Sequence, residues 1–141
     1  MGRLMLVLDT SVIYAAADRR DAAHERCRTL LAESEERLVL PAPTLPELDY
    51  LFRHRGVPEG TLTILSDIGR GSLSVLDPTH DDLHRASQVL QDYADLDVGF
   101  VDATVLAIVE RVDEPKLATL DHRHFAVMRP RHVEALELLP A

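Results

Sequence analysis

Residues 4–9, Leu-Met-Leu-Val-Leu-Asp, decide the fold of this chain because they form a continuous apolar run that ends at an acidic residue. Such a run is typical of a strand buried on both faces, as strands of parallel sheets are. Further apolar runs predict strands at 37–41, 72–76 and 116–120, and an edge strand at 133–138. Helical spacing of apolar residues predicts helices over 10–17, 22–32, 44–53, 58–69, 79–93 and 99–112.

The separation of these strands indicates how they are connected. About 20–40 residues of helical pattern lie between most successive strands, as right-handed crossovers between parallel strands require. The sequence therefore predicts an α/β fold, a three-layer α/β/α domain with a central, mainly parallel sheet of about five strands. The chain has 141 residues and no internal repeat or Gly/Ser linker, so we expect residues 1–141 to form one domain.

Charge and composition narrow the class of protein. The 24 acidic and 15 basic side chains give a formal net charge of −9, which by itself argues against a nucleic-acid partner. No apolar run approaches the ~18–20 residues of a membrane span, and Asp9 ends the first run too early for a signal peptide. The single cysteine, Cys27, excludes an intramolecular disulfide and a multi-cysteine zinc site. We expect a cytoplasmic protein.

Four acidic residues occupy positions that the predicted topology brings together. Asp9 and Asp121 directly follow strands, and Glu47 lies in the first turn of the helix after the second strand. In a parallel sheet these junctions share one edge, where ligands bind. Asp102 lies in the first turns of the apolar helix 99–112, so its place depends on packing.

Each of these acids also has a purely structural interpretation. Asp9 and Asp121 can cap helices, and Glu47 can complete a capping box with Thr44. Asp102 can interact with a helix dipole. Together, however, grouped carboxylates in apolar surroundings repel one another and raise each other's pKa values. A divalent Mg²⁺ or Mn²⁺ ion, which prefers oxygen ligands, would remove that cost.

The sequence offers no alternative nucleophile. Cys27 lies on the apolar side of a helix, and Ser11 has no histidine at a suitable neighbouring position. The seven histidines do not form a zinc-binding pattern, and we interpret His122 and His124 as surface residues. Water activated by a metal ion needs only the carboxylates and fits the attack on a phosphodiester.

Four short motifs carry a family resemblance: Leu-Asp-Thr-Ser at 8–11, Pro-Glu-Leu at 46–48, Val-Asp-Ala at 101–103 and Thr-Leu-Asp-His-Arg-His-Phe at 119–125. In this order and spacing the chain resembles PIN-domain ribonucleases, above all VapC-type toxins of type II toxin–antitoxin systems. The resemblance implies that one or two Mg²⁺ or Mn²⁺ ions are bound by an acidic quartet. Its members are Asp9, Glu47, Asp102 and Asp121.

The same resemblance implies partners and supporting residues. VapC-like toxins cut RNA (tRNA, rRNA or mRNA), inhibit translation, form homodimers and are inhibited by a cognate antitoxin protein. Thr10, Ser11 and Thr119 are candidates to hydrogen-bond the acids that hold the ion, and Asp95 and Asp97 are expected in a solvated loop. An acid-free segment after the last motif could meet RNA phosphates. The arginines of this acid-free segment are Arg123, Arg129 and Arg131.

Two other interpretations remain open at the level of sequence. The chain could be a catalytically inactive PIN-like binding module whose acids serve as caps. It could also be another Asp-dependent α/β phosphatase, although a haloacid-dehalogenase-like site would want a second aspartate where Ser11 stands. Metal binding and the effect of Asp9→Asn separate these interpretations from a nuclease.

Overall fold

The computed structural model describes residues 4–141, so the first three residues of the predicted domain lie outside the described residues. Five short strands form the centre of the molecule, and all of their pairings are parallel. They are β1 (Met5–Val7), β2 (Arg37–Pro41), β3 (Ser74–Leu76), β4 (Lys116–Ala118) and β5 (Glu137–Leu139).

The strands are grouped differently from the single five-stranded sheet that the sequence predicted. One sheet has the order β1-β2-β3, and β4 pairs with β5 in a second. An isolated parallel bridge between Leu8 and Ala118 places the end of β1 beside the end of β4. The predicted edge strand at 133–138 is shifted, because only residues 137–139 find a register against residues 116–118.

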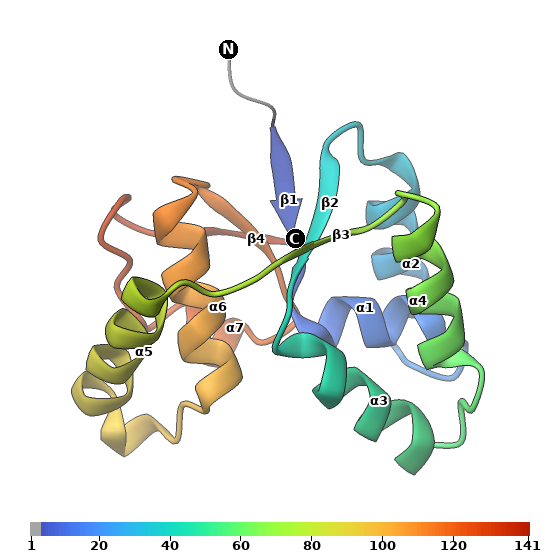
Figure 1. The fold of residues 1–141 in the computed structure, drawn as a ribbon, viewed down its shortest axis with the longest axis horizontal. Coiled ribbons are helices and arrows are strands. Elements are labelled where there is room, and N and C mark those ends of the chain that lie inside the picture. Colours follow the sequence, from blue (N-terminus) through green and yellow to red (C-terminus); the bar gives the residue numbers. More distant parts are fainter. Residues whose placement is uncertain (1–3) are drawn as a thin grey trace.

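Helices lie on both sides of the strands, with α1 to α4 on one side and α5 to α7 on the other (Figure 1). The predicted helices are all present, with small shifts at their ends. Two elements are additional: a 3₁₀ turn at Ala94–Leu96 and the short helix α7. The helices are α1 (Thr10–Ala17), α2 (His24–Glu33), α3 (Thr44–His54), α4 (Gly60–Gly69), α5 (His80–Asp92), α6 (Phe100–Arg111) and α7 (His122–Phe125).

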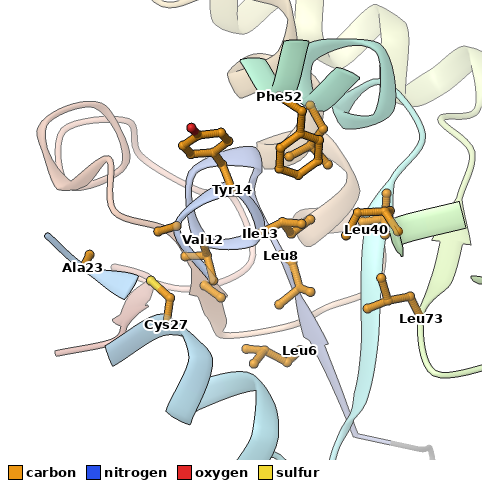
Figure 2. Close-up of a cluster of buried hydrophobic side chains, with 14 of the residues drawn as sticks. Leu6, Leu8, Val12, Ile13, Tyr14, Ala23, Cys27, Leu40, Phe52 and Leu73 are labelled. Atoms are coloured by element: carbon orange, nitrogen blue, oxygen red, sulfur yellow. The ribbon is translucent and has the colours of Figure 1, made fainter. Parts of the chain in front are cut away.

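The opening apolar run lies between two buried clusters. Leu6 and Leu8 pack with α1 and α3, where the rings of Tyr14 and Phe52 lie side by side (Figure 2). Val7 packs on the opposite side, against α5, α6 and α7. Since successive side chains of a strand point to opposite faces, a strand covered on both faces must be apolar at every position. The three-layer prediction is therefore confirmed.

Among residues 4–141, no helix is long and apolar enough to cross a membrane.

The feature that matters for function is the carboxyl edge shared by β1 and β4. The backbone N–H of Asp9 donates to the carbonyl of Ala118 over 2.9 Å. This bond brings the residues that follow β1 next to those that follow β4, although more than 100 positions separate them in the chain.

Candidate active site

The four predicted acids line one pocket at the carboxyl edge of the strands. Its volume is about 250 Å³. The structure thus confirms that Asp9, Glu47, Asp102 and Asp121 come together, including Asp102, which follows no strand. The other lining residues are Thr10, Ser11, Tyr14, Asp21, Leu51, Arg55 and Leu120.

Asp9 is almost fully buried, with 3% of its surface exposed, and it accepts several hydrogen bonds. Its Oδ1 accepts from the backbone N–H of Thr10 (2.8 Å), which makes Asp9 the N-cap of α1. Its Oδ2 accepts from the hydroxyls of Thr119 (2.8 Å) and Ser11 (3.2 Å). Burial nevertheless raises the pKa of Asp9 to about 6, although the bonds from Thr119, Thr10 and Ser11 favour its ionised form.

The two hydroxyls beside Asp9 also hold the β4 side of the site. Thr119 accepts from the backbone N–H of Asp121 (3.0 Å), and Ser11 accepts from that of Leu120 (3.0 Å). Each hydroxyl therefore ties the first acidic residue to the segment that carries the last one. The predicted hydrogen bonds of Thr10, Ser11 and Thr119 to an acid are confirmed. Thr10 makes its bond through the backbone N–H, whereas its hydroxyl is buried and has no hydrogen-bond partner among the described residues.

Asp102 lies in the first turn of α6, whose N-cap is Gly99. Among residues 4–141, no group donates a hydrogen bond to its carboxylate, and its nearest cationic partner is the Nδ1 of His124 at 3.7 Å. Burial, followed by the charges of Asp9 and Asp121, raises the pKa of Asp102 to about 7. Burial of this carboxyl group therefore costs free energy that no hydrogen bond to it offsets.

Asp121 and His124 form a pair that the sequence did not reveal. The carboxylate caps α7 through the backbone N–H of His124 (3.1 Å) and also lies 2.8 Å from the Nδ1 of the same residue. The other ring nitrogen, Nε2, lies 2.9 Å from the carbonyl oxygen of Leu96. When Asp121 is ionised, both partners accept hydrogen bonds, so both ring nitrogens donate and the ring carries a positive charge. The bond with Asp121 correspondingly raises the pKa of His124.

The interpretation of His124 as a surface residue was therefore wrong. In an extended segment, the side chains of His122 and His124 would point to the same side of the chain, away from that of Arg123. In the helix that forms at 122–125, position 124 instead lies over the capping acid, three residues from it. An Asp-x-x-His sequence after a buried strand is the signal that could have found this pair.

Glu47 faces the same pocket from α3, but not as a helix cap. The predicted capping box is absent, because the hydroxyl of Thr44 donates to the carbonyl of Pro41 (2.7 Å) and the N-cap position is held by Pro43 without a side-chain bond. The carboxylate of Glu47 forms no hydrogen bond or salt bridge among the described residues. Like Asp102, it is available to a ligand.

The donor atoms of this pocket fit a divalent cation. Ligand atoms of Asp102, Asp121 and His124 lie within 4.8 Å of one another. Since His124 donates from both nitrogens, the oxygens of the carboxylates are the atoms left for an ion, as Mg²⁺ and Mn²⁺ prefer. Burial is the main cause of the raised pKa values of Asp9 and Asp102, so both carboxylates are costly to ionise in this pocket.

The remaining predicted residues lie outside this pocket. Asp95 and Asp97 are exposed, as expected for a solvated loop. The guanidinium of Arg131 donates to Gln88 on α5, and the backbone N–H of Arg129 donates to the hydroxyl of Tyr93. The acid-free segment thus runs from the site toward α5.

The model of the PIN domain family matches residues 6–129, and the chain belongs to this family. It is similar to Ribonuclease VapC26 of Mycobacterium tuberculosis H37Rv, with 26% identity over 125 residues, 89% of this chain and 93% of that relative.

Solved structures share the fold. One is M. tuberculosis VapC20, a Sarcin-Ricin loop cleaving toxin, with a TM-score of 0.73 and 21% identity over 79% of this chain and 86% of that one. Another is a toxin–antitoxin complex from Klebsiella pneumoniae, with a TM-score of 0.62 and 18% identity over 87% of this chain and 92% of that one.

Proposed function

We propose that this protein is a metal-dependent endoribonuclease that hydrolyses phosphodiester bonds of RNA and acts as the toxin of a toxin–antitoxin pair. The observation that carries the proposal is the convergence of four carboxylates in one pocket, two of them without any structural bond. Membership of the PIN domain family, a family of nucleases, supports it. The names of its relatives, a ribonuclease VapC26 and a VapC20 toxin that cleaves the Sarcin-Ricin loop, point to RNA as the substrate.

The proposed cofactor is Mg²⁺ or Mn²⁺, held by the acidic quartet. Asp9 and Asp102 are the most direct ligands, and Glu47 and Asp121 complete the site directly or through water. When bound, such an ion lowers the pKa of a water molecule and stabilises the leaving oxygen of the phosphodiester.

The chain's own groups orient and charge this site. The hydroxyls of Ser11 and Thr119 donate to the Asp9 carboxylate and orient it. Each hydroxyl also accepts a hydrogen bond from a backbone N–H in the segment that follows β4. The imidazolium of His124 holds Asp121 and supplies one positive charge beside it. Glu47, free of a capping bond, is placed to accept a proton from the attacking water.

The proposed partners and location follow from the relatives. A cognate antitoxin protein is expected, since solved neighbours include a toxin–antitoxin complex, and a homodimer is the proposed assembly. The proposed RNA is a tRNA, an rRNA or an mRNA, and cleavage would inhibit translation. We place this activity in the cytoplasm and in a single domain that spans residues 1–141.

The test is cleavage of total RNA by the purified full-length chain, with Mg²⁺ or Mn²⁺ and with EDTA, followed by mapping of the new RNA ends. Asp9→Asn and Asp102→Asn should abolish the metal-dependent ends. Asp95→Asn, which changes an exposed acid outside the pocket, is the matched control and should cut like the unaltered chain. Cutting that survives both Asp9→Asn and Asp102→Asn would remove the nuclease assignment and favour a binding module.

A further inference from the structure

The pocket contains one cationic side chain that the proposed chemistry does not use. Among its described lining residues, Arg55 is the single lysine or arginine beside five carboxylic acids. We propose that Arg55 binds an RNA phosphate next to the one that is cut, and so positions the strand across the acids. This inference rests on the proposed ribonuclease function and deepens it.

The position of Arg55 in the chain explains its place in the pocket. Glu47 and Leu51 on α3 and Arg55, the C-cap residue of that helix, are spaced four residues apart and line the same pocket. At a rise of about 1.5 Å per residue, the Cα atoms of Glu47 and Arg55 are about 12 Å apart along the helix. The backbone of Arg55 is therefore offset along the helix axis from that of Glu47. This offset favours contact with a neighbouring phosphate over contact with the phosphate held at the metal site.

Two contacts hold Arg55 in place, one to its side chain and one to its backbone. Its guanidinium carbon lies 4.9 Å from the centroid of the Tyr14 ring, a cation–π geometry. Tyr14 is itself fixed by packing against Phe52, with ring centroids 5.4 Å apart, and its hydroxyl points away from the buried cluster (Figure 2). The guanidinium of Arg20 donates to the backbone carbonyl of Arg55 and holds the end of α3.

The guanidinium of Arg55 contacts an aromatic ring but has no acidic partner among the described residues. Among residues 4–141, it forms no salt bridge with an acidic side chain, whereas Arg20 pairs with Asp18 and Arg53 pairs with Asp49. An arginine that is supported by an aromatic ring but has no carboxylate partner retains its planar donor face for another anion. The phosphate of RNA is the anion that the proposed reaction brings to this pocket, and arginine binds it through paired N–H groups.

The phosphate contact also answers an electrostatic problem of the site. The excess of carboxylates in the pocket repels an RNA strand at every phosphate that is not held at the metal ion itself. A fixed arginine beside the acids offsets this repulsion for one neighbouring phosphate. Neither Arg129 nor Arg131, which the sequence favoured for RNA contact, lines this pocket.

The experiment measures binding separately from cutting. In the full-length Asp102→Asn chain, the dissociation constant is measured by fluorescence anisotropy for a short RNA that contains the cut site mapped with the unaltered chain. Adding Arg55→Ala should weaken binding about fivefold to tenfold and lower the salt slope by about one. Arg55→Lys should recover part of the affinity. Arg53→Ala is the matched control, because Arg53 is an exposed arginine on the same helix outside the pocket.

Neutral methylphosphonate linkages locate the contact. Placed one at a time beside the cut site, one such linkage should weaken binding to the Arg55 chain by the same factor as Arg55→Ala, and should have no further effect on the Arg55→Ala chain. Equal RNA affinities of the Arg55→Ala and Arg53→Ala chains would refute the role of Arg55. So would a methylphosphonate that, at every position tested, weakens binding to the Arg55→Ala chain as much as it weakens binding to the Arg55 chain. Loss of antitoxin binding alone would refute it too. RNA cutting by the unaltered chain decides the ribonuclease proposal independently.

Discussion

Removal of one carboxylate from the pocket should stabilise the metal-free protein. Asp102→Asn keeps the size of the side chain, and the carboxylate that it replaces accepts no hydrogen bond among the described residues. Asp9→Asn is a poorer choice for this test, because Asp9 accepts bonds from Thr10, Ser11 and Thr119 that an amide would disturb. The gain should come from relief of burial and of repulsion between carboxylates.

The size of the effect follows from the pKa of Asp102. A value of about 7 in the folded chain, against an ordinary 3.8, corresponds to a penalty of about 4 kcal/mol once the unfolded chain is fully ionised. Solvent at the partly exposed side chain and the repulsion shared with Asp9 reduce what one substitution recovers. We expect a gain of about 1–3 kcal/mol in the free energy of unfolding at pH 8 without metal.

The sign of the pH dependence is specific. Below about pH 3, Asp102 is largely protonated in both states and the substitution should change little. As the pH rises from about 4 to about 7, the unfolded chain releases a proton that the folded chain retains, so the unaltered protein loses stability. The advantage of Asp102→Asn should therefore grow over this range and remain constant above it.

Urea unfolding in EDTA at several pH values between 4 and 8 measures this advantage, with Asp95→Asn as the control for removal of an exposed acid. Addition of Mg²⁺ should stabilise the unaltered chain more than the Asp102→Asn chain. An Asp102→Asn chain that is no more stable than the unaltered one at pH 8, or whose gain does not shrink on acidification, would refute this account of the pocket.

Three further substitutions, each measured by urea unfolding, test two groups beside the acids and one close contact in the buried core. Thr119→Val removes a buried hydroxyl that bonds both Asp9 and the backbone N–H of Asp121, and should cost about 1–3 kcal/mol. His124→Ala removes the imidazolium beside Asp121; because its pKa is raised, the loss of about 1–3 kcal/mol should be larger at pH 6 than at pH 9. Gly60→Ala places a methyl group 2.5 Å from a buried aromatic ring and should cost about 1–3 kcal/mol.

The sequence was sufficient for features that are set by local order along the chain. An acid that directly follows a buried parallel strand must emerge at the carboxyl edge, so Asp9 and Asp121 could be placed from their neighbours alone. The alternation of Leu6, Val7 and Leu8 between two clusters likewise follows from strand geometry.

Other features depend on tertiary contacts that carry no local signal. Asp102 reaches the pocket because α6 packs beside the strands, and nothing in the helix pattern fixes its direction. The four residues of α7 are too few to show helical periodicity, so only the three-residue spacing of Asp121 and His124 after a buried strand could have indicated their pairing. The capping box at Glu47 failed because Thr44 found a nearer acceptor in the carbonyl of Pro41.

The four acids thus divide into two kinds, and the division explains why the cap interpretation was half right. Asp9 and Asp121 cap helices, so their positions have a structural use whether or not they bind a ligand. Glu47 and Asp102 cap nothing in the described chain, yet they lie in the same pocket. Only the start of α6 and His124 at 3.7 Å favour the Asp102 carboxylate, and its raised pKa shows that burial outweighs them. A bound cation would supply the missing compensation, so the acids that do least for the fold bear most directly on the proposed function.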